Sequence, residues 1–214
     1  MNVVINLNNV VQNLKKYSKQ TVNIIAVSKT FSLNEIRPLI DFGHIHFGEN
    51  RVNEALDKWS EIIIHYPKIQ LHLIGRLQSN KVADALRIFS YIHSLDSIKL
   101  AEKLSFEQER TQKYLKYFIQ VNFENEKQKG GIPEDQIKEF LNFCRITKKL
   151  NIVGLMCIPP IDKPPELYFQ KLQSLAKINN VPELSMGMSS DYIKAVEFGS
   201  SFIRIGSLIF GNRK

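Results

Sequence analysis

The chain has 214 residues, of which 43% are hydrophobic and 23% charged, a balance that excludes a disordered, collagen-like or coiled-coil protein. The longest apolar runs, such as 24–27, span about four residues, which excludes a membrane-spanning helix of roughly 20 residues. The net charge of +8 is spread along the chain without a basic block, so we expect neither a nucleic-acid nor a membrane partner.

Strand patterns alternate with helix patterns through the whole chain, which we interpret as one domain over residues 1–214. A helical spacing of apolar residues over 7–14 predicts an additional helix that covers the N-terminal end. The strands that we expect after it are 23–28, 44–47, 70–74, 91–95, 117–122, 152–156, 183–186 and 202–205.

Two of the intervening helices carry clear signals. The capping box of residues 32–35 opens the first, Gly43 ends it in the left-handed conformation, and Pro38 should kink or shorten it. The second follows Pro133 and repeats apolar residues at helical spacing over 137–144. Cys144 and its counterpart Cys157 form no CxxC pair, so we expect two buried thiols.

Eight βα units in about 200 residues predict a (β/α)8 TIM barrel, because parallel strands need crossovers of this length. The alternative is an open doubly wound sheet. Such a sheet usually carries a glycine-rich turn after its first strand, where this chain has Ser28-Lys29-Thr30-Phe31.

In a barrel, functional residues gather at the carboxyl ends of the strands, and Lys29 follows the first strand there. Apolar walls favour the neutral, nucleophilic form of an amine, which forms Schiff bases. A solvated surface lysine is the competing interpretation. The last two strands run into the small-residue turns 184–190 and 202–207, which offer hydroxyls and backbone N–H groups to a phosphate. Ordinary turn chemistry explains either segment alone.

The histidines suggest a rival site. His44 and His46 should share one face of the second strand, and His72 lies on the third, a pattern with which a metal hydrolase could begin. We favour packing or hydrogen bonding within the barrel, since no matching set of ligands follows. A GxSxG motif for nucleophilic hydrolysis is absent from the sequence.

Taken in order, the motifs resemble the pyridoxal phosphate homeostasis proteins, small barrels related to the N-terminal domain of alanine racemase that bind pyridoxal 5'-phosphate (PLP). The motifs that carry this resemblance over essentially the whole chain are AVSKT (26–30), FGENRVNEA (47–55), HLIGRLQSNK (72–81), VNFENEKQKGG (121–131), GLMCIPP (154–160), LSMGMSSDY (184–192) and RIGSLIFG (204–211).

The resemblance implies that Lys29 forms the Schiff base with PLP, that Asn50 lies beside the cofactor ring and that Arg204 faces the pyridine nitrogen. Cys157 and Ile158 stand in a segment that usually reads Ala-Ile in the family, and we expect neither to touch the cofactor.

The resemblance also places Ser185, Gly206 and Ser207 in the phosphate-binding cup, with Met186 near the cofactor. The implied function is intracellular PLP homeostasis by a cytoplasmic monomer that carries or regulates PLP, is not an enzyme, and has PLP-dependent apo-enzymes as candidate partners. One alternative is an amino-acid racemase, which needs an acid or base on each face of Cα. Another is an anion- or nucleic-acid-binding module that uses the net positive charge.

Overall fold

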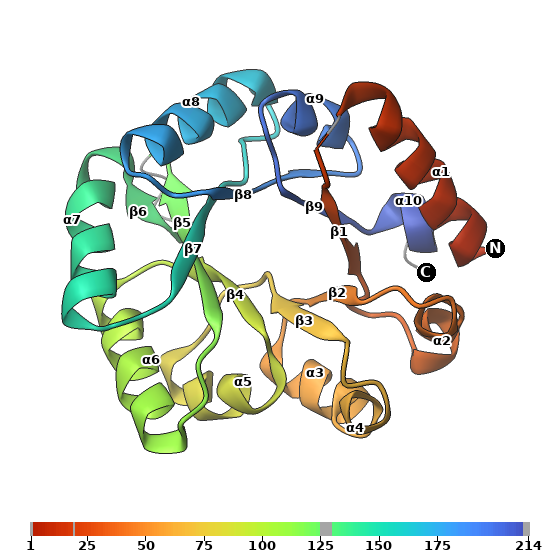
Figure 1. The fold of residues 1–214 in the computed structure, drawn as a ribbon, viewed down its shortest axis with the longest axis horizontal. Helices are drawn as coiled ribbons and strands as arrows, with labels where there is room; N and C mark the ends of the chain where they lie inside the picture. Colours follow the sequence, from red (N-terminus) through yellow and green to blue (C-terminus); the bar gives the residue numbers. More distant parts are fainter. Residues whose placement is uncertain (1, 19, 125–129, 212–214) are drawn as a thin grey trace.

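The computed structural model describes residues 2–18, 20–124 and 130–211, so positions 125–129 of the 121–131 motif lie outside the described residues. The strands are β1 (Asn23–Val27), β2 (His46–Glu49), β3 (Gln70–Leu73), β4 (Tyr91–Leu95), β5 (Lys116–Asn122), β6 (Ile132–Pro133), β7 (Ile152–Met156), β8 (Glu183–Met188) and β9 (Phe202–Ile205). The helices and helical turns between them form an outer ring (Figure 1). They are α1 (Val3–Tyr17), α2 (Leu33–Asp41), α3 (Val52–Trp59), α4 (Ile62–His65), η1 (Ser79–Lys81), α5 (Val82–Ile88), α6 (Ile98–Thr111), η2 (Glu134–Gln136), α7 (Ile137–Asn142), η3 (Phe143–Thr147), α8 (Pro165–Ile178), α9 (Tyr192–Glu197) and α10 (Ser207–Phe210).

All the strands except the short β6 close into a parallel barrel, in the order β1-β2-β3-β4-β5-β7-β8-β9 and back to β1. The predicted (β/α)8 barrel is therefore confirmed. The largest differences from the predicted boundaries are in β2, which spans 46–49 instead of 44–47, and in β8, which continues to Met188 instead of ending at 186. The ends of β1 and β3 and the start of β5 differ by one residue. The two-residue β6, which the sequence did not indicate, pairs with β5.

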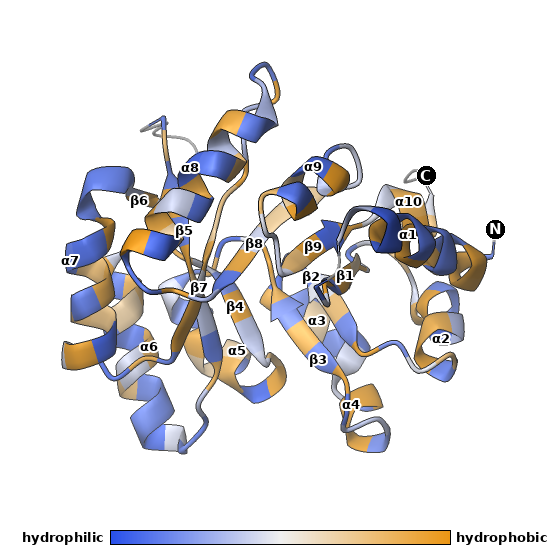
Figure 2. Cartoon of the chain, turned by 45° about the horizontal axis from the view of Figure 1, so that its top comes forward, coloured by the Kyte–Doolittle hydropathy of each residue, from blue (hydrophilic) through white to orange (hydrophobic). Residues whose placement is uncertain are grey.

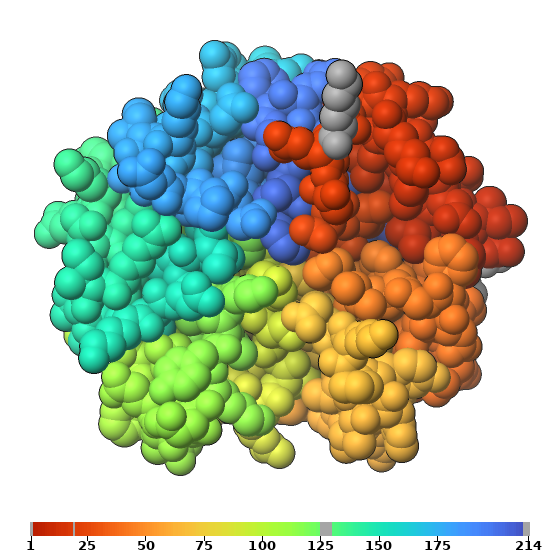
Figure 3. Space-filling model, viewed as in Figure 1, coloured from red at the N-terminus to blue at the C-terminus, as the bar shows by residue number. Residues whose placement is uncertain are grey.

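The additional N-terminal helix is present as α1, and it lies in the outer ring against α2, α9 and α10. The first and last segments of the chain are neighbours in the space-filling view (Figure 3). In α2, the carboxylate of Glu35 accepts from the backbone N–H and hydroxyl of Ser32, as the capping box predicts. The helix runs through Pro38 to Asp41 without being shortened, and Gly43 follows at φ +89°.

Inward and outward residues alternate along the strands, which gives the molecule two apolar cores. The outward residues pack under the helices, whose sequences alternate between hydrophobic and hydrophilic stretches (Figure 2). The inward residues form a separate cluster, consisting of Ile25, Tyr91, Phe118, Met156 and Phe202. Gly154 makes room for it, since a Cβ there would lie 2.2 Å from the Phe118 ring. Within the part of the chain that the structure describes, no helix is long and apolar enough to cross a membrane.

Candidate functional site

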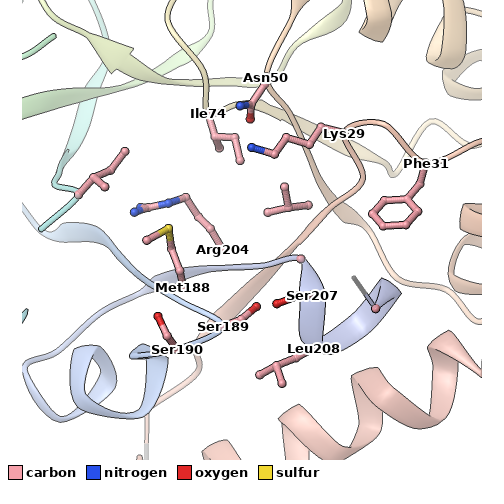
Figure 4. A pocket seen from close by; sticks show the side chains of 14 residues that line it. Lys29, Phe31, Asn50, Ile74, Met188, Ser189, Ser190, Arg204, Ser207 and Leu208 are labelled. Atoms are coloured by element: carbon pink, nitrogen blue, oxygen red, sulfur yellow. The ribbon is translucent and has the colours of Figure 1, made fainter. Parts of the chain in front are cut away.

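A pocket of about 670 Å³ lies at the carboxyl ends of the strands, within the size range of sites for small ligands. Figure 4 shows Lys29 and Asn50 on one side of it and Ser189, Ser190 and Ser207 on the other. Its lining comprises Val27, Lys29, Phe31, Asn50, Ile74, Ile158, Met188, Ser189, Ser190, Arg204, Gly206, Ser207, Leu208 and Gly211. Five of the seven residues expected at a cofactor site therefore share one cavity, and Ser185 and Met186 do not line it.

The main chain on both sides of Lys29 is held by hydrogen bonds from outside the barrel. Lys58 Nζ donates to the carbonyl of Ser28 at 2.9 Å, and Glu54 Oε1 accepts from the N–H of Thr30 at 2.6 Å. Thr30 has φ +69°, a conformation that a β-branched residue rarely adopts. These contacts fix the turn that presents Lys29 to the pocket.

One buried carboxylate joins these contacts into a network. Glu49 Oε1 accepts from Lys58 Nζ at 3.0 Å, from Ser28 Oγ at 2.8 Å and from Trp59 Nε1 at 2.9 Å. Lys58 also pairs with Glu54 at 3.1 Å. We call Glu49, Glu54 and Lys58 the β1 clamp. We did not expect this network from the sequence, although Glu54 and Lys58 stand at the i, i+4 spacing of a helical ion pair.

Arg204 is held from inside the barrel and is only 5% exposed. Its Nη1 donates to Ser185 Oγ at 2.8 Å and its Nη2 to the carbonyl of Cys157 at 3.0 Å. Among the described residues, no Asp or Glu forms an ion pair with it. Burial lowers the pKa of the guanidinium, because its charge is poorly solvated there. A ligand atom that accepts a hydrogen bond from Arg204 would stabilise this charge.

Ser185 and Met186 lie on β8 and do not line the pocket. Ser185 is fully buried and contacts Arg204, whereas Met186 belongs to the outer core, since successive residues of a strand point to opposite faces. The segment 157–158 does reach the site, since the Cys157 carbonyl contacts Arg204 and Ile158 lines the pocket. Both cysteines are buried thiols, and burial raises each pKa to about 12.

Behind Ser185, three histidines continue a line of hydrogen bonds through the barrel. His93 Nδ1 lies 2.8 Å from Ser185 Oγ, His72 Nδ1 lies 2.9 Å from His93 Nε2, and His46 Nδ1 lies 3.0 Å from His72 Nε2. We call His46, His72, His93 and Ser185 the histidine column. His44 precedes β2 and contacts the carbonyl of His46, so the expected pair on one strand face does not form.

The environment of the column favours neutral imidazole rings, and two of them stack on aromatic side chains, His72 on Tyr91 and His93 on Phe118. Burial lowers the pKa of His72 and His93 well below the usual value, and burial, aided by His44 and Lys116, lowers that of His46 to about 4. In the described residues, no group of His, Cys, Asp or Glu side chains is arranged to hold a metal ion. The histidines interact with one another, as favoured above.

Asn50 and the serine turns complete the pocket. The Asn50 Oδ1 is buried and has no hydrogen-bond partner among the described residues, which is unfavourable unless a ligand supplies a donor. Gly75 lets its backbone approach, because a Cβ there would lie 2.3 Å from the Asn50 carbonyl oxygen. A Cβ on Gly206 would meet only Val27, at 3.6 Å. Adding one therefore fills pocket space without disturbing the protein.

The sequence matches the family described as "Alanine racemase, N-terminal domain" over residues 5–214. The chain is 37% identical over 202 residues to the pyridoxal phosphate homeostasis protein of Synechocystis, with 90% of this chain and 92% of the relative covered. It is 34% identical over 229 residues to that of Aquifex aeolicus, with both chains fully covered.

Solved structures have the same fold as this chain. PipY of Synechococcus elongatus, in a structure with PLP bound, superposes with a TM-score of 0.85 at 33% identity, covering 98% of this chain and 100% of PipY. The alanine racemase of Clostridium difficile, at 12% identity and a TM-score of 0.75, matches over 99% of this chain and 57% of its own, and shows the fold alone. With a closed barrel, a lysine at the end of its first strand and relatives that match along nearly all of its length, the chain belongs to the pyridoxal phosphate homeostasis proteins of the alanine racemase N-terminal domain family.

Proposed function

We propose that the protein binds PLP in this pocket, holds it as a Schiff base on Lys29 and serves intracellular PLP homeostasis as a carrier or regulator. The observation that carries the proposal is that Lys29 and Arg204 line one cavity whose far side is made of serine turns. PLP has three features to match: an aldehyde, a pyridine nitrogen and a phosphate.

The residues fit this ligand. Lys29 would hold PLP at the aldehyde carbon as a Schiff base, a C=N bond whose formation releases the carbonyl oxygen as water. The Arg204 guanidinium would donate to the pyridine nitrogen, and Asn50 Oδ1 would accept a hydrogen bond at the ring edge. The hydroxyls of Ser189, Ser190 and Ser207 and the backbone N–H of Gly206 would bind the phosphate. Ser185 then acts on Arg204 instead of on the phosphate, and Met186 supports the turn from the core.

The same residues account for binding without turnover. An arginine at the pyridine nitrogen donates a hydrogen bond and leaves that nitrogen unprotonated, which makes the ring a poor acceptor for electrons from Cα. Racemisation also needs a second acid or base. Apart from Lys29 and Arg204, the described lining of the pocket contains no ionisable side chain. This supports a homeostasis role over the racemase alternative.

The experiment is absorption spectroscopy of purified protein, followed by borohydride reduction and peptide mass spectrometry. We expect a visible band and a reduced adduct on Lys29, both lost in Lys29→Ala, whereas Lys99→Ala on the exposed surface of α6 should retain them. A reduced adduct on another lysine contradicts the assignment. Deuterium exchange at the Cα of alanine at enzyme-like rates would favour the racemase.

The phosphate site has a separate test, absorbance titration of the apo-protein with PLP and with pyridoxal, which lacks the phosphate. Several donors of about 1.5 to 3 kcal/mol each predict that pyridoxal binds far more weakly. Gly206→Ala should weaken PLP binding more than Ser207→Ala does, since its Cβ takes pocket space. Equal dissociation constants for PLP and pyridoxal would refute this placement of the phosphate. Transfer to a PLP-dependent apo-enzyme, measured with free PLP trapped, tests the carrier role.

A further inference from the structure

The histidine column has one direction of hydrogen bonding, and Arg204 sets it. A guanidinium only donates, so Ser185 Oγ accepts from Arg204 Nη1. The hydroxyl of Ser185 has one proton, and His93 Nδ1 is its other partner in the described chain. Ser185 therefore donates to His93 Nδ1.

The remaining protons follow by elimination. With Nδ1 accepting, neutral His93 carries its proton on Nε2 and donates to His72 Nδ1. His72 then carries its proton on Nε2 and donates to His46 Nδ1. His46 in turn is protonated on Nε2. All three rings hold the same tautomer, and each hydrogen bond points away from the pocket.

This direction affects Arg204. A hydroxyl that donates to an imidazole becomes a better acceptor, and neighbouring hydrogen bonds in a chain polarise one another. Ser185 therefore holds the guanidinium more firmly than an isolated serine would. The rings must stay neutral, because a charged His93 would repel Arg204. Three other charged or titratable groups lie near the column. Lys116 and His44 oppose its protonation, and Tyr91 stacks on His72 with its hydroxyl on Lys116.

We propose that Ser185, His93 and His72 are positioning residues that aim Arg204 at the ring nitrogen of the ligand through a single, directed line of hydrogen bonds. The proposal rests on the proposed function for the ligand, but the tautomers belong to the protein alone. Packing also locks the rings, since His72 stacks on Tyr91 and His93 on Phe118, each at 4.3 Å between centroids.

The first test is ¹⁵N NMR of the histidine side chains at pH 7, without added ligand. We expect His46, His72 and His93 each to be neutral and protonated on Nε2. A proton on Nδ1 of any of the three, or a charged ring, overturns the directed column. This result does not depend on whether the protein binds PLP.

The second test compares PLP with an analogue that has carbon in place of the ring nitrogen. His93→Phe keeps the stacking on Phe118 and removes the acceptor for Ser185. We expect it to weaken PLP binding about tenfold and to shift the absorption maximum of bound PLP, while binding of the analogue stays unchanged. Equal losses for both ligands would show a merely structural role and overturn the proposal.

Two further variants test whether the effect of His93→Phe comes from misfolding. His93→Asn offers an amide oxygen near the place of Nδ1 and should restore most of the affinity for PLP. Tyr91→Phe removes a hydroxyl from the same interior layer, one that contacts Lys116 and not the column, and should leave the spectrum unchanged. If wild-type protein binds neither ligand, the proposed function fails while the NMR result still decides the column.

Discussion

The two basic side chains of the pocket are held in opposite ways. The β1 clamp lies outside the barrel, where it holds the main chain on both sides of Lys29 and the side chain of Ser28. The histidine column holds Arg204 from inside the barrel, through its side chain and with neutral partners. Charges that compensate one another suit the fixing of a strained turn, whereas neutral partners leave the charge of Arg204 available to a ligand.

The largest expected effect comes from breaking the clamp. Lys58→Met leaves the fully buried Glu49 without its cationic partner, so we expect the free energy of unfolding to fall by about 3–5 kcal/mol. Urea denaturation measures it. Lys68→Met, at an exposed position, should stay within about 0.5 kcal/mol of wild type. A similarly small loss for Lys58→Met would mean that the clamp is not stabilising.

The matching substitution on the other side should have a different result. Arg204→Met removes a buried charge that has no ion-pair partner in the described chain. The relief of its desolvation offsets the roughly 1–3 kcal/mol lost at the Cys157 carbonyl, which is left without its donor. We expect unchanged or higher stability in urea, together with loss of PLP binding. A marked loss of stability would show that Arg204 is needed for the fold, and the contrast with Lys58 would disappear.

A smaller effect concerns pH. The folded state keeps His46 neutral down to about pH 4, whereas the unfolded chain protonates it near 6.5. The contribution of His46 to the free energy of unfolding is therefore fully present above pH 6.5. It falls as the pH drops towards 4, by at most about 1.4 kcal/mol per pH unit. His46→Asn should flatten the curve of unfolding free energy between pH 6.5 and 5.5. An unchanged slope contradicts the pKa shift.

The smallest effect is expected at Thr30. Glycine adopts a positive φ without strain, so Thr30→Gly should raise stability by up to about 1 kcal/mol, measured by thermal unfolding. The relaxed turn should at the same time present Lys29 less well and weaken PLP binding. Parallel gains in stability and affinity would mean that the turn does not position the lysine.

The sequence predicted the barrel because its signal is repeated eight times and does not depend on any single boundary. Lys29 was found for the same reason, since a residue at a strand end faces the pocket if the strand exists. Arg204 was indicated only by the family resemblance. Ser185 was expected at the phosphate, whereas residues 188–190 line the pocket, because β8 continues two residues beyond its predicted end. Strand length depends on pairing with neighbours, which local sequence does not encode.

The histidine column was anticipated only in part, since hydrogen bonding of His46 and His72 within the barrel was expected but the link to His93 and Ser185 was not. His46, His72 and His93 occupy inward positions on three consecutive strands, but the expected start of β2 at residue 44 drew attention to the wrong pair. The useful signal was a polar residue recurring on otherwise apolar strands. Its meaning depends on register, since β2 and β3 pair His46 with Gln70 and Gly48 with His72.

The packed interior of the barrel also limits the route by which a ligand enters and leaves the pocket. Tyr91, Phe118 and Phe202 close the channel beneath Arg204, together with the stacked histidines. Within the described residues, a ligand therefore enters and leaves the pocket at the carboxyl ends of the strands. Under the proposed carrier role, an acceptor protein would take up PLP after its release or at the rim formed by the turns after β1, β8 and β9.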